Sequence, residues 1–159
     1  MKNSLNTVIV NGFKIHLGNR ENLINYALKT KGILLALNTE KIYSQNPLIK
    51  KLAQEGIGYP DGIGAVWACK RKGFFEARKI PGSELWLDII GFSEGKKSIY
   101  IVGSTQNVIE ETIIKLKSQF PKINIVGFRN GFFEDFEKVE LGYPGYFLIV
   151  QERFITFVV

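Results

Sequence analysis

Short apolar segments alternate with amphipathic segments through most of the chain, and this order restricts the fold more than any other feature. The run Ile33–Leu37 is apolar at every position, which is typical of a strand covered on both faces of a sheet. The segment Ile109–Phe120 instead repeats its apolar residues every three or four positions, as a helix does. Strands that alternate with such helices indicate an α/β fold.

A β-hairpin is predicted ahead of this alternating part. The segments Thr7–Val10 and Phe13–Leu17 flank Asn11-Gly12, a pair that favours a tight type I′ turn. Further strands are predicted at residues 57–59, 98–102 and 123–127, and helices at residues 20–31, 47–55, 65–70, 83–90 and 106–120. This order predicts a Rossmann-like fold, with a mostly parallel sheet, helices on both faces and an N-terminal hairpin.

The 159 residues fit one domain, and a hydrophobic content of 45% can fill its core. We expect the α/β domain to cover residues 1–142 and a divergent apolar tail to cover residues 143–159. Two short strands fit this tail, but no helix follows to cover them. The chain is therefore interpreted as C-terminally truncated, and a homo-oligomer is a candidate for shielding the apolar tail.

The basic balance of the chain permits an anionic partner. A net charge of +6 and a pI near 9.4 suit nucleotide diphosphates, a membrane surface or nucleic acid, although a solvated basic face is the alternative. Lys70-Arg71-Lys72 lies beside Phe74 and Phe75, which favours a patch facing lipid headgroups. Nucleic acid is disfavoured because stacking aromatics are not interleaved with the basic residues.

Several site types are disfavoured by what the sequence lacks. The single histidine, His16, and the single cysteine, Cys69, cannot build a metal cluster alone; His16 is expected on a strand surface and Cys69 in the core. There is no Gly-x-Gly-x-x-Gly and no Walker A lysine, so we expect no dinucleotide cofactor and no P-loop. No apolar run reaches the roughly 20 residues that span a bilayer.

The segment Tyr59–Gly64 places one carboxylate, Asp61, between a predicted strand and a predicted helix. Ligands of α/β sheets bind at such junctions, and glycines allow close backbone approach. Asp61 is a candidate general base, provided that it reaches a hydroxyl at hydrogen-bond distance. The alternative is that its side chain only caps the following helix, which is a common role for aspartate.

Three other segments carry candidate binding residues. Asn38 and Thr39 follow the apolar run 33–37 and can orient a sugar or phosphate, although helix capping explains them equally well. Gly103 and Ser104 end another strand and can hold a diphosphate on backbone N–H groups and a helix dipole. Lys79 can neutralise a leaving-group phosphate, or simply be solvated.

Taken in order, the motifs resemble the WecG/TagA/CpsF glycosyltransferases. The resemblance covers about residues 5–135, and its most specific part is Asp-Gly-Ile-Gly at positions 61–64. It rests on residues 38–42, 59–68, 79–86, 102–104, 124–127 and 130–133. Lys79 and Glu84 depart from the arginine and aspartate that the family usually has there; lysine keeps the charge but loses the bidentate fork.

The resemblance implies a metal-independent, inverting transferase that moves a sugar such as N-acetylmannosamine from a UDP donor. The acceptor it implies is a polyprenyl-diphosphate-linked N-acetylglucosamine at the cytoplasmic face of the membrane, contacted peripherally. By position, Asp61 is then the catalytic base, with Asn38, Thr39, Lys79, Gly82, Gly103 and Ser104 in the substrate sites. The chain has no Asp-x-Asp metal motif. The alternative is a truncated, non-catalytic remnant that at most binds nucleotide.

Overall fold

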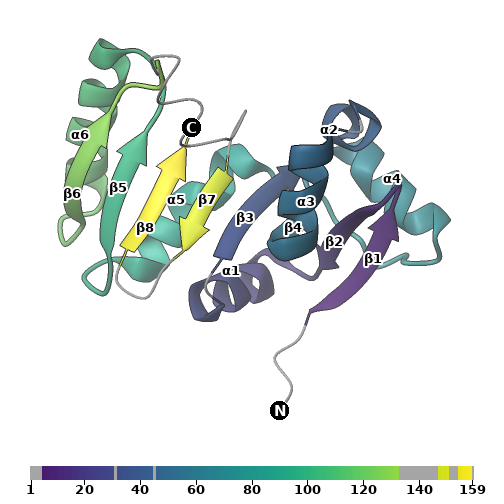
Figure 1. Cartoon of the computed structure of the whole chain (residues 1–159). Coiled ribbons are helices and arrows are strands. Elements are labelled where there is room, and N and C mark those ends of the chain that lie inside the picture. Colours follow the sequence, from purple (N-terminus) through teal and green to yellow (C-terminus); the bar gives the residue numbers. More distant parts are fainter. Residues whose placement is uncertain (1–4, 31, 45, 133–146, 151–153, 159) are drawn as a thin grey trace.

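A six-stranded sheet organises the computed structural model, which describes residues 5–30, 32–44, 46–132, 147–150 and 154–158 (Figure 1). Its strand order is β4-β3-β7-β8-β5-β6, and every strand except β7 runs in the same direction. The strands span Gly32–Leu37 (β3), Ile57–Pro60 (β4), Ser98–Val102 (β5), Asn124–Arg129 (β6), Phe147–Val150 (β7) and Phe154–Val158 (β8). The prediction of a mostly parallel sheet is confirmed.

The predicted hairpin is also present and lies beside the large sheet. Strands β1 (Asn6–Val10) and β2 (Phe13–Leu17) pair antiparallel, and β2 packs against β4 (Figure 1). Asn11 and Gly12 between them have φ values of 51° and 83°. Both values fit the left-handed turn that this pair predicts.

Six helices occupy the described part of the chain, and their starts follow local sequence signals. They are α1 (Arg20–Lys29), α2 (Thr39–Ser44), α3 (Pro47–Glu55), α4 (Ile63–Arg71), α5 (Gly82–Ser93) and α6 (Gln106–Gln119). The Asn19 side chain accepts a hydrogen bond from the backbone of Asn22, and Asn46 caps α3 in the same way. Helix α5 begins at Gly82, one residue before the predicted start at residue 83, with Pro81 at the N-cap.

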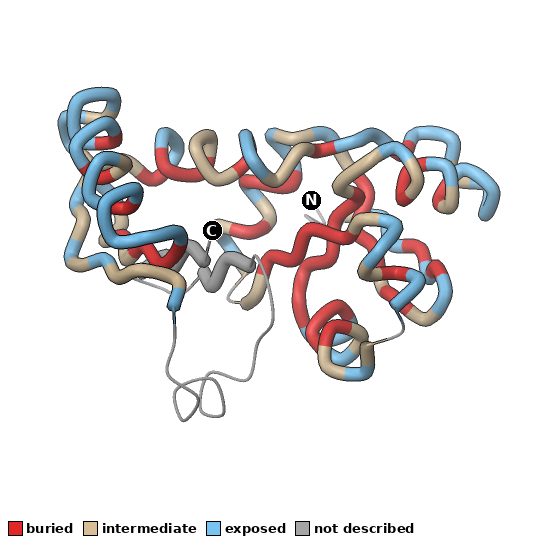
Figure 2. The backbone as a smooth tube through the Cα atoms, turned by 90° about the horizontal axis from the view of Figure 1, so that it is seen from above, coloured by how far each residue is buried: buried red, intermediate tan, exposed pale blue. Residues whose placement is uncertain are grey.

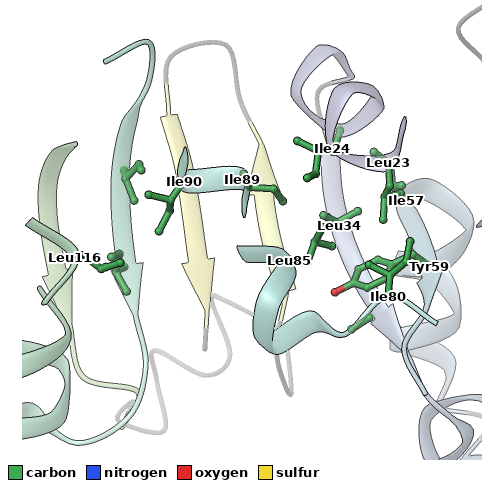
Figure 3. Packing of buried hydrophobic residues seen from close by; sticks show 14 of the residues in the cluster. Leu23, Ile24, Leu34, Ile57, Tyr59, Ile80, Leu85, Ile89, Ile90 and Leu116 are labelled. Carbon is green, nitrogen blue, oxygen red and sulfur yellow. The ribbon is translucent and has the colours of Figure 1, made fainter. Parts of the chain in front are cut away.

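Alternate residues of β3 are buried in two separate cores, one on each face of the sheet. Leu34 and Ala36 pack with residues of α1, α5 and α6, whereas Leu35 and Leu37 pack with α2, α3, α4 and the hairpin. Figure 3 shows Leu34 among the residues of the first core. Figure 2 shows the outer turns of the helices exposed. Within β3, residues 34–37 are buried and the first two residues are partly exposed. The fully apolar run thus has the two-sided burial that it predicted.

The two strands expected near the C-terminal end are β7 and β8. They pair with each other and lie between β3 and β5, rather than at an edge of the sheet. Local sequence predicts that these segments are extended, but pairing with strands more than 50 positions earlier is a tertiary property. The expected boundary between domain and tail at residues 142 and 143 lies outside the described residues.

The expected surface position of His16 is wrong. Its side chain is only 5% exposed, and its ring packs against Tyr26 with centroids 5.7 Å apart. Its Nδ1 lies 3.2 Å from the carbonyl oxygen of Gly58, which can only accept, so Nδ1 carries the proton. Strand β2 is covered on both sides because the hairpin packs against β4 and α1, which the hairpin sequence alone does not reveal.

The burial of His16 predicts that folding stability falls in mild acid. Burial lowers the pKa of His16 below its ordinary value of 6.5, so the unfolded chain binds a proton that the folded chain resists. Stability is fully present above pH 6.5 and declines as the pH falls below it. We expect urea midpoints to drop between pH 7.5 and 5.5, and to drop less in His16→Asn, which keeps an N–H donor. An equal slope in both proteins would contradict this assignment.

Candidate functional site

The carboxyl ends of β3 and β4 bring two of the expected polar segments together. The strands are parallel, with Leu37 opposite Pro60, so the residues that follow them emerge at the same edge. The backbone N–H of Asp61 donates to the carbonyl of Leu37 at 2.9 Å, and Asn38 comes next in the chain. The sheet edge thus joins Asn38 and Asp61 in one place, as parallel strand order predicts.

The side chain of Asp61 is not a helix cap. The N-cap of α4 is Gly62, whose φ of 109° suits glycine, and no side chain caps this helix. The Asp61 carboxylate is half-buried and accepts no hydrogen bond from the described residues. The capping alternative is therefore wrong, and the carboxylate remains available for a ligand.

Gly82 allows the start of α5 to approach this carboxylate. The backbone N–H of Ile80 donates to the carbonyl of Pro60 at 3.0 Å, which draws the segment to the end of β4. A Cβ atom on Gly82 would lie 3.0 Å from the Tyr59 hydroxyl and 3.5 Å from Asp61 Oδ2. Burial and the nearby Asp61 charge raise the pKa of Tyr59 well above its ordinary value of 10.0. Its hydroxyl therefore stays protonated beside the carboxylate.

Asn38 and Thr39 have different roles at the start of α2. Asn38 Oδ1 accepts the backbone N–H of Lys41 at 2.9 Å, so Asn38 is the residue that caps this helix. The Thr39 hydroxyl lies against the first turn of α4, where a Cβ atom on Gly64 would overlap it. Thr39 thus lies against the helix that directly follows Asp61, and its hydroxyl is not needed as a cap.

Lys79, Gly103 and Ser104 border the same sheet edge at greater distances. The exposed Lys79 precedes Ile80, the residue whose backbone is bonded to the end of β4, but within the described residues its side chain forms no ion pair with Asp61. Gly103 and Ser104 follow β5, which is separated from β3 by β7 and β8. Three strand spacings of about 4.8 Å put them roughly 14 Å from the end of β3. They do not touch Asp61.

The turn at Gly103 and Ser104 is built around backbone groups. The two residues have φ values of 154° and 54°, and the carbonyl of Ser104 accepts the backbone N–H of Gly131 at 2.9 Å. Helix α6 follows directly from Thr105, and no side chain caps its first turn. Backbone N–H groups at such a helix start favour anions, so the predicted diphosphate contact remains a prediction for this turn.

Lys41 belongs to the same edge, although no sequence pattern predicted a role for it. Its ammonium donates to the carbonyl of Ala36 at 2.9 Å and is partly buried. Burial lowers the pKa of Lys41 from its ordinary value of 10.5, while the charges of Asp61 and Glu40 oppose that change. The sequence feature that could have indicated a role for Lys41 is its place three residues after Asn38, within the polar segment that follows a buried strand.

Fold and site together define an α/β protein whose polar residues gather where parallel strands end, the usual ligand position of this class. A model of the glycosyl transferase WecG/TagA/CpsF family matches residues 8–142. The chain belongs to this family. Within the described ranges, no three potential ligands among His, Cys, Asp and Glu cluster closely enough to hold a metal ion, and no helix is long and apolar enough to cross a membrane.

Two similar curated proteins carry the name N-acetylglucosaminyldiphosphoundecaprenol N-acetyl-beta-D-mannosaminyltransferase. The protein from Bacillus spizizenii is 33% identical over 97 residues, which are 60% of this chain and 38% of that protein. The protein from Bacillus subtilis is 29% identical over an alignment of 111 residues that covers 60% of this chain and 41% of that protein. The chain thus spans about two fifths of the length of these relatives.

Proposed function

We propose that this chain carries the catalytic base of a transferase that moves an N-acetylmannosamine-like sugar from a UDP donor. The proposed acceptor is N-acetylglucosamine linked through a diphosphate to a polyprenyl lipid, as the names of both relatives suggest. The observation that carries the proposal is the Asp61 carboxylate, which caps no helix and lies beside Gly82 at the edge of the parallel sheet.

The proposed reaction is a single displacement with inversion at the anomeric carbon. Asp61 takes the proton of an acceptor hydroxyl while that oxygen bonds to the anomeric carbon. The bond from this carbon to the donor diphosphate breaks, and UDP leaves with the electron pair. Lys79 and the backbone N–H groups after Gly103 stabilise the departing charge without a metal ion. Tyr59 offers a protonated hydroxyl beside the base.

Two measurements on the chain test this function against the non-catalytic alternative. Calorimetry with UDP tests nucleotide binding, and a transfer assay with a UDP-linked N-acetylmannosamine and a lipid-linked acceptor tests catalysis. We expect both binding and transfer. Binding without transfer favours the remnant that only holds nucleotide, and the absence of both contradicts the proposed function.

The outer face of α4 suits a peripheral contact with the inner face of the cytoplasmic membrane, where we place the acceptor. Ile63 and Trp67 lie four residues apart on this face, and Trp67 is 63% exposed. Phe75 follows at 76% exposed, next to the exposed run Lys70-Arg71-Lys72. Exposed aromatics beside cations favour the headgroup region of an anionic bilayer. The patch begins two residues after Asp61, so an acceptor in the membrane surface would have its hydroxyl close to this carboxylate.

This membrane contact predicts binding to anionic vesicles. We expect the chain to sediment with vesicles containing one third phosphatidylglycerol, and Trp67→Ser with Phe75→Ser to reduce the bound fraction several-fold because interfacial aromatic area is lost. Ile114→Ser is the matched control, since Ile114 is 69% exposed on α6, away from the patch. Equal loss in the control, or no loss in the double variant, would contradict the assignment.

A further inference from the structure

Lys41 occupies a place that the function described so far does not explain. The short helix α2 carries it back over the end of β3, where its ammonium donates to the carbonyl of Ala36 at 2.9 Å. An ammonium has three N–H groups, and the described residues accept only this one. No carboxylate of the described residues lies within 4.0 Å of it.

The hydrogen bonds of β3 show on which side of the strand this ammonium lies. The carbonyl of Leu37 points toward β4, because it accepts the N–H of Asp61. Successive carbonyls of a strand point in opposite directions, so the carbonyl of Ala36 points toward β7 and, beyond it, β5. The described pairing of β3 with β7 ends one residue earlier, at Leu35. Lys41 therefore lies on the side of β3 that faces the turn at Gly103 and Ser104.

The electrostatics of this position favour an anionic ligand. Burial penalises the charged form of Lys41, and one neutral carbonyl compensates only part of that cost. The charge of Asp61 acts on Lys41 from nearby, although the two groups form no ion pair. A phosphate oxygen would accept the remaining N–H groups in charge-assisted hydrogen bonds.

We propose that Lys41 is a binding residue for the diphosphate of a nucleoside diphosphate donor. This inference rests on the proposed function and adds a second cation, besides Lys79, near the reacting bond. The base Asp61 lies toward β4, the turn after Gly103 lies toward β5, and Lys41 stands between them at the end of β3. The bond from the sugar to the diphosphate would then lie between base and cation, where negative charge develops as UDP leaves.

Three substitutions separate the charge of Lys41 from its structural contact. Lys41→Gln keeps an N–H donor for Ala36 without the charge, and Lys41→Arg keeps the charge. Lys115→Gln removes an exposed lysine of α6 and serves as the control. Calorimetry with UDP, inorganic pyrophosphate and uridine then measures each ligand separately. We expect Lys41→Gln to weaken UDP and pyrophosphate roughly 10- to 100-fold, as for a lost charged hydrogen bond, and to leave uridine unchanged.

A pH series gives a readout that a purely structural role would not change. Burial lowers the pKa of Lys41, so Lys41 loses its proton at a lower pH than an ordinary lysine does. As the pH rises, the affinity for UDP should therefore begin to fall at a lower pH in the wild type than in Lys41→Arg. The groups whose charges act on Lys41 are Asp61 and Glu40.

The outcomes distinguish this inference from the proposed function. Equal binding of UDP and pyrophosphate by the wild type and Lys41→Gln overturns the role of Lys41, even if transfer is intact. Pyrophosphate binding that depends on Lys41, without UDP preference and without transfer, supports the anion site and overturns the proposed function. If the wild type binds neither ligand, both are wrong. A loss of stability in Lys41→Gln with unchanged affinities also assigns Lys41 a structural role only.

Discussion

Asp61→Asn is expected to lower the rate of sugar transfer by about 100-fold or more, within the range that a general base contributes to catalysis. The amide cannot take a proton from the acceptor hydroxyl, yet it has nearly the same size as the carboxylate. The fold should persist because Asp61 is bonded to Leu37 through its backbone, and its side chain does not cap α4. Single-turnover rates with saturating donor and acceptor, together with a urea titration, measure the two effects separately.

Asp88→Asn is the matched control for this substitution. Asp88 is also a half-exposed carboxylate, but it accepts a hydrogen bond from Arg20 at 2.9 Å on the face formed by α1 and α5. Its loss should leave the transfer rate within about two-fold, because an exposed ion pair contributes little to stability. Undiminished turnover by Asp61→Asn would show that Asp61 is not the base. A similar decrease in both variants would indicate a general electrostatic effect.

Gly58→Ala is expected to reduce the free energy of unfolding by about 3 kcal/mol, at the upper end of the range for overpacked cores. A Cβ atom at this position would lie 2.5 Å from the carbonyl oxygen of Lys14 and 2.6 Å from Cδ1 of Leu37. The first of these atoms belongs to the backbone of the hairpin, so relief requires β2 to move away from β4. Such a movement would also break the contact between His16 and the carbonyl of Gly58.

Urea denaturation followed by circular dichroism measures this loss as a lower midpoint. Gly91→Ala is the control, because Gly91 is exposed within α5 and the nearest atom, Cε1 of Phe120, would lie 3.4 Å from its Cβ. Alanine is favoured over glycine inside a helix by up to about 1 kcal/mol, so this variant should be neutral or slightly more stable. Equal midpoints for Gly58→Ala and the wild type would contradict the close packing of hairpin and sheet.

Several parts of the fold follow from local sequence. The pair Asn11-Gly12 forms the turn predicted for it, and Asn19 and Asn46 cap the helices predicted to follow them, because such roles depend on side-chain oxygens and φ angles within a few residues. Burial of Ile33–Leu37 on both faces also follows from its composition. The meeting of Asn38 and Asp61 follows from the rule that parallel strands end at one edge.

Other features depend on contacts between distant segments. His16 is buried because β2 packs against β4 and α1, and nothing within the hairpin distinguishes its two faces well enough to predict this. An aspartate before a helix looks the same in sequence whether or not its side chain caps that helix. Only the structure shows that Gly62 is the N-cap of α4 and that Asp61 does not cap it. The ammonium of Lys41 is placed by its hydrogen bond to one carbonyl of β3, that of Ala36.

The sequence by itself determined the α/β class, the family and the residues that gather at the ends of β3 and β4, since these depend on periodicity, local caps and strand direction. Only the tertiary structure decided which of those residues keep a side chain available for chemistry. In the structure the carboxylate of Asp61 caps no helix, Asn38 caps α2, and Lys41 is partly buried at the same edge. The physical reason is that hydrogen-bond partners and desolvation are set by neighbours that are remote in sequence.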